Sequence, residues 1–475
     1  MNQIGQGIIY IFGAKVAVVF LALLNAILIP RILGPESMGF YTYWLSVYFI
    51  LGTILSLGGS SIIFRYIPEF RKKDPESIRP LLKRMLWIKI PMVILIFFAS
   101  QFVKEKAYFL LILLSAAIFS LGLMVRDILY AYKYMGKYSF LQPSNMLSKL
   151  ILILILFSFW QNPGILLAII LNSTLITLIF GIFVFKLLPK TSGALNRPFR
   201  EILSFGLLLY LGGLLSTLTH WLLPVLLKRY IEDLAAIGYM GLGIQVYLLI
   251  INFVSSVGEG VLPSLIEFYT EADERFTRSI QLTWRYTNSI LLPAVFGIFI
   301  LVEPAITLLV GERFLPSVKI IKLLLPGAIF VCWARIQEQI LFSFKKKSQI
   351  FFVQLIEFVT FLGASLYLIK NYGIIGAPVS LSLAALVGFV LSLFFSWNLK
   401  PIPEYFPSFF KPLIASCIMG FFIKSFSVTN LLGLAGAILS GMMIYLIIMA
   451  AIRGIAREDL KRVARIFLDK EGDKR

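Results

Sequence analysis

Long apolar runs separated by short charged turns recur along the whole chain and constrain its fold more than any other feature. A helix needs about 20 apolar residues to cross the hydrocarbon core of a bilayer. Bounded by charge clusters and by Pro, Gly or Asn, these runs predict about fourteen transmembrane helices. We place them at residues 7–29, 39–64, 85–103, 108–131, 140–160, 165–186, 202–227, 235–263, 286–303, 322–343, 350–369, 374–397, 412–427 and 431–452.

The composition excludes an ordinary soluble protein. Of the 475 residues, 59% are hydrophobic and 14% are charged, and the mean hydropathy is +0.89. Soluble domains carry about 25% charged residues, and a single folded core stops growing near roughly 250 to 300 residues. We therefore expect an all-α integral membrane protein with lipid as the solvent for much of its surface.

The charge balance predicts an orientation in the membrane. The chain has 44 Lys and Arg against 24 Asp and Glu, a net charge of +20. In a soluble protein this excess would suggest a nucleic-acid partner, but here it follows the rule that cytoplasmic loops collect Lys and Arg. One set of alternate loops carries about three times as many basic residues as the other, which predicts that both termini are cytoplasmic.

No residue pattern indicates catalysis or a structural metal. Cys332 and Cys417 lie inside apolar runs, which argues against a disulfide framework and a zinc site. The predicted loops are short, and no glycine-rich phosphate loop, Ser/His/Asp set or His/Cys/Asp cluster is found in the sequence. Met1 to Gly5 lacks a basic signal region, so the first run is expected to stay as a span. We therefore expect no enzymatic activity and no cofactor.

Three sequence matches, each offset by roughly 200 residues, indicate an internal repeat. The turn at 31–41 is echoed at 229–239, so that Gly39 corresponds to Gly238. The stretch 128–133 is echoed at 340–345, and 162–165 at 371–374. Because each repeat holds an even number of crossings, the two halves are expected to be parallel, related by an axis along the membrane normal.

These repeats predict five parts of the chain. An N-terminal six-helix bundle at 1–188 is followed by a cytoplasmic linker at 189–201 and a second six-helix bundle at 202–399. Two further helices occupy 400–453. The basic stretch 454–475 is expected to form an amphipathic helix on the cytoplasmic leaflet, with a solvated tail as the alternative.

The chain resembles the polysaccharide-biosynthesis transporters, the Wzx-type lipid-linked oligosaccharide flippases. Three turns carry the resemblance: Arg31-Ile-Leu-Gly-Pro-Glu-Ser-Met-Gly39, Tyr132-Lys133, and Tyr372-Gly373-Ile-Ile-Gly376-Ala377-Pro378. That family belongs to a superfamily that also holds the lipid II flippase MurJ and the multidrug and toxin extruders. The resemblance covers essentially the whole chain in span count and spacing.

The resemblance implies a fold and an activity. The fold would be two bundles in a V around a central cavity, with the last two helices forming a lipid-facing groove. The activity would be alternating-access movement of a lipid-pyrophosphate-linked oligosaccharide, such as an O-antigen unit of lipopolysaccharide or a capsule unit, from the cytoplasmic to the outer leaflet. It also implies the bacterial or archaeal inner membrane, a monomer, and the glycan polymerase or glycosyltransferases of the same pathway as partners.

Charges inside apolar spans are the candidate site residues, because burying them is costly unless a cavity or partner stabilises them. A pyrophosphate favours Arg, which donates two hydrogen bonds in a fixed fork. Arg335, near the middle of its span, and Arg126 are the first candidates for substrate binding, followed by Lys15 and Arg285. Near span ends, snorkelling to the surface is the alternative, and it applies to Lys15, Lys89, Lys149, Arg285 and Lys424.

Three acidic residues are expected to partner these cations in the cavity: Asp127, Glu338 and Glu259. Arg335 and Glu338 are three residues apart on one helical face, so a purely structural ion pair is the alternative. Arg126 and Asp127 are adjacent and point about 100° apart, so each is expected to take a partner on another helix. The repeat superposes Arg126 on Glu338, which predicts that they approach one cavity from opposite bundles.

Three further residues are candidates for Na⁺ or H⁺ coupling. Glu357 lies well inside its span, and the seventh span carries Thr217 and His220. The alternatives are a Glu that is hydrogen-bonded within helix packing and a His placed at the membrane interface beside Trp221.

Two other functions compete with the flippase. A cation-coupled multidrug extruder of the same superfamily is expected to have an acid-lined cavity rather than one with arginines. An integral-membrane glycosyltransferase or polymerase needs carboxylates or a metal site in sizeable outer loops, which are short here.

Overall fold

The computed structural model describes residues 3–189, 191, 193–270, 275–397, 399, 405–426, 428–452 and 454. Within these ranges the side chains of 3–12, 102, 205, 256–270, 275 and 405–407 are not described. The predicted tail helix therefore lies outside the described residues, apart from Gly454. All regular secondary structure in the described ranges is helical, as the sequence predicts.

Five α-helices form the first half of the chain. They are α1 (Gln3–Ser56), α2 (Gly59–Lys73), α3 (Ile78–Ala99), α4 (Lys106–Ala131) and α5 (Met135–Leu187). The second half contains α6 (Phe199–Trp221), α7 (Leu223–Ile231), α8 (Leu234–Thr270), α9 (Arg275–Ala305), α10 (Pro316–Ser343), α11 (Lys347–Tyr372), α12 (Gly376–Trp397), α13 (Tyr405–Lys424) and α14 (Leu431–Ala451).

Nine segments of the described residues are long and apolar enough to cross a membrane. Three of them, Gly13–Ser56, Met135–Leu187 and Lys347–Trp397, have 44, 53 and 51 residues. One crossing needs only about 20 residues, so each is long enough for two. The chain is thus an all-helical, multi-pass membrane protein.

Two of these long segments turn back on themselves at a residue with positive φ. In α1, Gly34 has φ 72° and is followed by Pro35, which cannot donate a helical hydrogen bond. In α5, Gln161 has φ 50° and precedes Pro163. Both turns fall between spans that the sequence predicts as separate, so the punctuation by Gly and Pro located them correctly.

Two predicted spans are each divided into two helices, beside a Gly or Pro inside the span. The span at 39–64 breaks at Leu57 and Gly58, whose φ values of 49° and 71° end α1 and start α2. The span at 202–227 breaks at Leu222, because Pro224 sits in the first turn of α7 and favours a helix start there. In both cases the apolar run continues past the break, so the sequence predicts one span where the structure has two helices.

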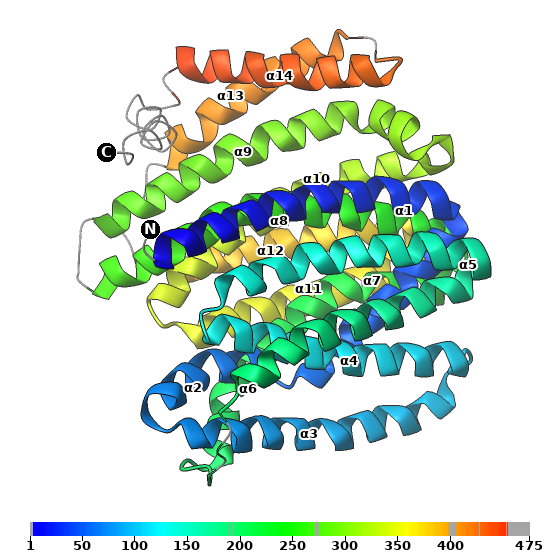
Figure 1. The fold of residues 1–475 in the computed structure, drawn as a ribbon. Helices are drawn as coiled ribbons and strands as arrows, with labels where there is room; N and C mark the ends of the chain where they lie inside the picture. The colour runs from blue at the N-terminus through cyan, green and yellow to red at the C-terminus, as the bar shows by residue number, and fades with distance from the viewer. Residues whose placement is uncertain are drawn as a thin grey trace, which may run out of the picture.

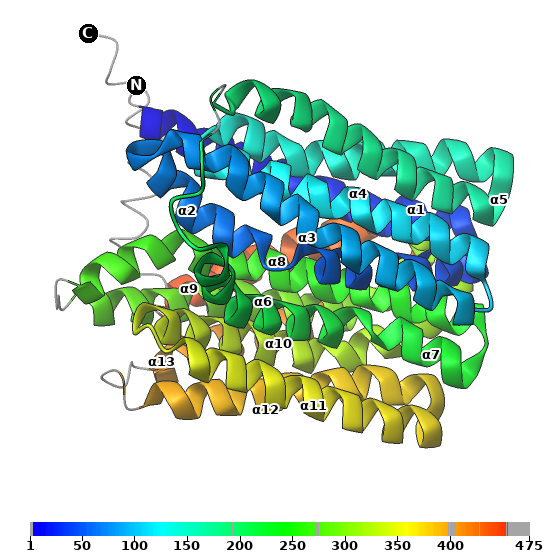
Figure 2. The same ribbon diagram turned by 90° about the horizontal axis from the view of Figure 1, so that it is seen from below.

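The helices lie side by side in several layers (Figures 1 and 2). Helices α1, α4 and α5 pack against one another, as do α10, α11 and α12, while α13 packs on α9 and α14. In Figure 2, α5 and α11 lie on opposite sides of the molecule. We call the end with the turns at Gly34 and Gln161 the kink end, and the end with the turns at 132–134 and 344–346 the N-terminal end.

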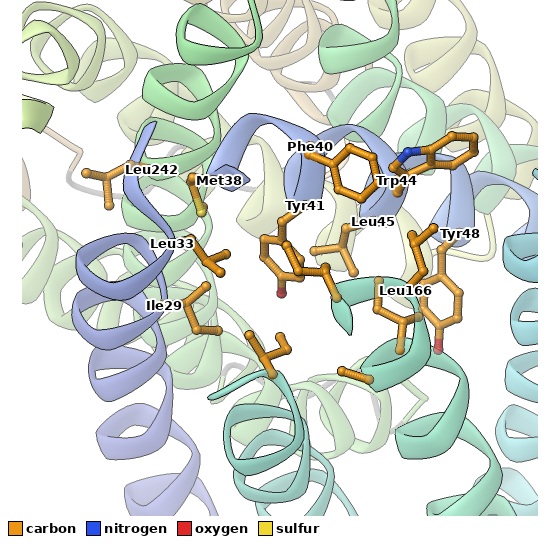
Figure 3. Close-up of a cluster of buried hydrophobic side chains, with 14 of the residues drawn as sticks. Ile29, Leu33, Met38, Phe40, Tyr41, Trp44, Leu45, Tyr48, Leu166 and Leu242 are labelled. Atoms are coloured by element: carbon orange, nitrogen blue, oxygen red, sulfur yellow. The ribbon is translucent and has the colours of Figure 1, made fainter. Parts of the chain in front are cut away.

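The largest buried cluster surrounds the turn in α1. Figure 3 shows Ile29 and Leu33 before the turn and Tyr41 and Leu45 after it, with Leu242 contributed by α8. Burying such side chains keeps the two arms of α1 against α5 and α8.

The two halves meet at a very close crossing of α1 and α8. A Cβ atom added at Gly39 would lie 1.7 Å from the carbonyl oxygen of Leu234, and one added at Gly238 would lie 2.0 Å from that of Pro35. Only glycine fits at either position. Gly39 and Gly238 are the pair that the sequence repeat relates, so equivalent residues of the two halves face each other at the kink end.

Candidate substrate site

A polar group lies within the second half, on α10 and α11. Arg335 is exposed and projects from α10, and Glu338 follows it by one helical turn. Gln354 of α11 lies within hydrogen-bonding range of Glu338, and Glu357 lies within electrostatic range of both Glu338 and Arg335. A Cβ atom at position 388 of α12 would come within 2.8 Å of the Glu357 carboxylate, so the glycine there makes room for it.

His220 of α6 and Tyr247 of α8 complete this group. Their ring centroids are 6.1 Å apart, and both residues lie within electrostatic range of Arg335. His220 Nδ1 contacts the carbonyl oxygen of Ser216 at 2.8 Å, and the buried Tyr247 hydroxyl has no hydrogen-bond partner in the described part of the chain. The structure therefore brings Arg335, Glu338, Glu357 and His220 together, with Tyr247, which was not a candidate from the sequence.

Arg335 has no direct partner among the described residues. Neither Glu338 nor Glu357 comes within 4 Å to form an ion pair with it, although both are close enough to interact electrostatically. The structural ion pair considered for Arg335 and Glu338 is therefore not formed here. A guanidinium inside an apolar span whose donors are not engaged by the described residues is suited to an external anion.

A second polar group occupies the first half. Arg126 Nε and Nη2 donate to Asp127 Oδ1 at 2.9 and 2.7 Å, and Ser60 of α2 donates to Asp127 Oδ2 at 2.5 Å. The Asp127 side chain is 1% exposed and that of Arg126 is 37% exposed. Three of the five guanidinium N–H donors of Arg126 have no hydrogen-bond partner among the described residues.

This geometry corrects one expectation. We predicted from their directions on the helix that Arg126 and Asp127 would not pair, yet they form an ion pair. The Arg side chain is long enough to turn back across its own helix, and the low dielectric of the interior rewards the contact. The predicted approach of Arg126 and Glu338 to one cavity is not seen as a contact, because each interacts with residues of its own half.

Lys89 does not extend to a membrane surface, as the snorkelling alternative would have it. It is 6% exposed, and its ammonium donates to the carbonyl oxygen and the hydroxyl of Ser120 on α4, each at 3.1 Å. The charge therefore stays inside the protein rather than reaching either surface.

The remaining candidates lie elsewhere. Arg285 on α9 stacks over the Tyr286 ring at 5.4 Å, and Lys15 is half-buried on α1. The Thr217 hydroxyl donates to the carbonyl oxygen of Gly213 in its own helix at 2.9 Å. The side chain of Glu259 lies outside the described residues.

Polar contacts close the kink end between the two halves. Lys228 of α7 forms an ion pair with Glu105, the residue before α4, at 2.8 Å, and its ammonium lies 4.0 Å from the centroid of the Tyr43 ring. Arg31 of α1 donates to the carbonyl oxygen of Leu309 at 3.2 Å.

At the N-terminal end the linker between the halves is attached to the elbow between α2 and α3. Arg197 forms an ion pair with Glu69 at 2.7 Å, and Asn196 donates to Asp74 at 2.6 Å. Ser77 donates to the carbonyl oxygen of Ala194 at 3.0 Å. The part of the linker that the structure describes is therefore held by side chains and is not a free tether.

An apolar pocket of about 260 Å³ opens between α9, α10, α12 and α13. Its walls are almost entirely aromatic and aliphatic. They are Trp284, Trp333, Phe389, Leu393, Trp397, Phe409 and Phe410.

Comparison with known proteins identifies the family. A family model described as polysaccharide biosynthesis protein matches residues 4–269, more than half of the chain. The chain belongs to this polysaccharide biosynthesis family. No curated protein sequence matches it.

Solved structures with the same fold are transporters. A structure of the lipid II flippase MurJ in an inward closed conformation superposes with a TM-score of 0.72 at 18% identity, covering 94% of this chain and 98% of that one. The MATE multidrug transporter DinF-BH, in complex with a ligand, gives 0.57 at 14% identity, covering 85% and 95%. A MOP superfamily transporter from Pyrococcus furiosus gives 0.52 at 14%, covering 83% and 92%. This family and these neighbours agree with the expectation that the chain is not an enzyme.

Several residues of these groups were not predicted from the sequence. Ser60 and Ser120 carried no signal, because a hydroxyl is unremarkable in an apolar helix. Lys228 and Glu105 lie outside the predicted spans, and nothing in the sequence related them. The aromatic pocket could not be separated from lipid-facing Phe and Trp residues.

Proposed function

We propose that this member of the polysaccharide biosynthesis family is a flippase for a lipid-pyrophosphate-linked oligosaccharide. The observation that carries the proposal is the Arg335 guanidinium, which lies inside a membrane span with no hydrogen bond or ion pair to the described residues. A cation at this depth in a membrane protein is costly unless an anion or water reaches it. The pyrophosphate headgroup supplies that anion.

Arg126 supports the same proposal from the other half. Asp127 occupies two of its donors and fixes the guanidinium, while three donors are not engaged by the described residues and remain for a ligand. An arginine in each half suits alternating access, in which the two halves rock about a site that lies between them.

The topology of the proposal follows the sequence predictions. Fourteen crossings arise when α1, α5 and the α11–α12 segment each cross twice and α6 with α7 crosses once. The basic loops put both termini in the cytoplasm of a bacterial or archaeal inner membrane. The halves at 1–188 and 202–399 would then move as two bundles, in a protein that acts as a monomer alongside the glycosyltransferases or polymerase of its pathway.

The aromatic pocket supports a lipid-linked rather than a free substrate. The resemblance to the Wzx-type flippases implies a groove for the lipid tail beside the last two helices, and Phe409 and Phe410 of α13 line an apolar pocket. The tail would remain in this apolar environment while the headgroup crosses.

Coupling to Na⁺ or H⁺ is assigned to Glu357. Its carboxylate lies within electrostatic range of Glu338 and Arg335, and the Tyr247 hydroxyl nearby has no partner among the described residues. His220 is close to the same group, whereas the Thr217 hydroxyl is engaged by its own helix.

The test is reconstitution in vesicles that contain a fluorescent lipid-pyrophosphate sugar. We expect Arg335→Ala and Arg126→Ala each to slow transbilayer movement about tenfold or more, because a charge-assisted hydrogen bond contributes about 1.5 to 3 kcal/mol. Arg313→Ala removes an exposed arginine outside the site and is expected to move lipid at the wild-type rate.

Two results would contradict the proposal. If the wild-type protein moves no lipid-pyrophosphate but expels amphipathic cations, the chain is a multidrug extruder. If both arginine variants move the lipid at the wild-type rate, the assigned site is wrong while the fold stands.

A further inference from the structure

Lys89 is a buried cation that the proposed function does not use. It lies on α3, is 6% exposed, and donates to the backbone and side chain of Ser120. No carboxylate lies within 4 Å of its ammonium among the described residues, although Asp127 is close enough to interact electrostatically. An ammonium can donate three hydrogen bonds. Two go to Ser120, so the third N–H has no acceptor among the described residues and is available to a ligand.

A small cavity adjoins Lys89, and we call it the Lys89 pocket. It is lined by Ser56, Leu57, Ile62, Met85, Ile88, Lys89, Phe199 and Leu203. Its volume of about 10 Å³ is room for a single water molecule. Phe199 and Leu203 belong to α6, whereas the other residues belong to the α1–α3 region, so both halves of the chain contribute walls. The pocket must therefore widen when α6 moves away from α2 and α3.

The charges around the Lys89 pocket favour an anion. Lys89 and Arg126 outnumber the single carboxylate of Asp127, which leaves a net positive charge. In addition, α2 begins at Gly59 without a side-chain cap at Gly58. The unpaired N–H groups of a helix start carry a partial positive charge and bind phosphates in many proteins. This helix start lies inside the membrane region, next to the pocket lining.

We propose that the Lys89 pocket is a second phosphate site, occupied by the headgroup of the lipid-linked substrate when α6 separates from α2 and α3. The proposal rests on the proposed function and adds a step to it. The third N–H of the ammonium then donates to a phosphate oxygen. In the structure, where α6 packs against α2, the pocket is too small for anything larger than water.

The experiment compares the dependence of transport on substrate in vesicles, using the full-length chain. Lys89→Met removes the charge and keeps the length, and we expect it to raise the half-saturating mole fraction of lipid-pyrophosphate sugar about tenfold while the maximal rate changes less than about twofold. Lys89→Arg keeps the charge and is expected to stay within about threefold of wild type. Lys149→Met, a half-buried lysine of α5 outside the pocket, is the matched control.

A second variant guards against a folding defect. Leu203→Trp fills the pocket from the α6 wall and leaves Lys89 in place, so it should raise the half-saturating mole fraction as Lys89→Met does. Thermal unfolding of each variant in detergent identifies any that fail to fold.

Competition distinguishes the sources of the phosphate. Undecaprenyl pyrophosphate without sugar is expected to compete in wild type and to lose about tenfold in potency in Lys89→Met. Competition by inorganic pyrophosphate at equal concentration would assign the pocket to free phosphate instead of a lipid headgroup and overturn the proposal.

The outcomes separate this inference from the proposed function. If wild type moves no lipid-pyrophosphate, the proposed function fails. If wild type moves it and both Lys89→Met and Leu203→Trp show the wild-type half-saturating fraction, the Lys89 pocket is not a substrate site, while Arg335 and Arg126 keep their role.

Discussion

Single residues in this protein acquire their roles from what surrounds them rather than from their type. Arg335, Arg126 and Lys89 are all cations within membrane spans, yet one has no partner among the described residues, one is fixed by Asp127 and one donates to Ser120. Asp127 stands at the centre of the first-half group, because Ser60 and Arg126 both donate to it. The same carboxylate offsets the charge of Lys89 nearby.

Replacement of Asp127 tests this arrangement. Asp127→Asn keeps the volume but removes the charge that Arg126 and Lys89 share, so it should lower the free energy of unfolding by about 1 to 3 kcal/mol. The measurement is thermal unfolding in detergent, with the exposed Glu312→Gln as the control. An unchanged unfolding temperature would mean that the pair contributes nothing to stability.

At the scale of helices, the close crossing of α1 and α8 depends on two glycines. The sequence repeat relates Gly39 to Gly238, but it does not reveal that they touch. A side chain at either position meets a backbone carbonyl group, which has no rotamer with which to move away.

Substitution at the crossing should therefore be costly. Gly238→Ala is expected to destabilise the protein by about 1 to 3 kcal/mol, as overpacking does elsewhere. Gly436→Ala in α14 is the control, since no atom lies within 4 Å of the added Cβ and alanine favours the helix. Equal unfolding temperatures for the two variants would contradict the close approach.

The helix pattern was largely predictable, because apolar length, Gly-Pro punctuation and repeat spacing are local properties of the chain. The turns at Gly34 and Gln161 fall where the sequence predicts them. The breaks at Leu57 and Leu222 were harder to place, because apolar residues continue on both sides of each and only Gly58 and Pro224 mark them locally.

At the scale of the whole molecule, the two halves are joined at both ends. The Lys228–Glu105 ion pair and the Arg31 contact with Leu309 lie at the kink end, and the linker contacts with Glu69, Asp74 and Ser77 lie at the N-terminal end. The contacts at the kink end must break if that end opens.

Loss of the ion pair at the kink end should shift the balance of conformations. Exposed pairs contribute about 0.2 to 1 kcal/mol, so Glu105→Gln is expected to raise the population open at that end by up to about fivefold. Spin labels at Lys104 and Glu232, in a background without Cys332 and Cys417, would report the distance between the halves. A distance distribution identical to that of the unmutated pair would show that the contact does not hold this end closed.

Sequence alone determined that the chain is a membrane protein, that it is helical, where most spans begin and end, and which family it resembles. These properties follow from hydrophobic length, charge asymmetry and turn residues, each of which acts over a few tens of residues. Tertiary structure decided which charges share a site. Asp127 reaches Ser60, Lys89 reaches Ser120 and Glu357 approaches Arg335 only because distant helices are packed together, and no local pattern encodes that distance.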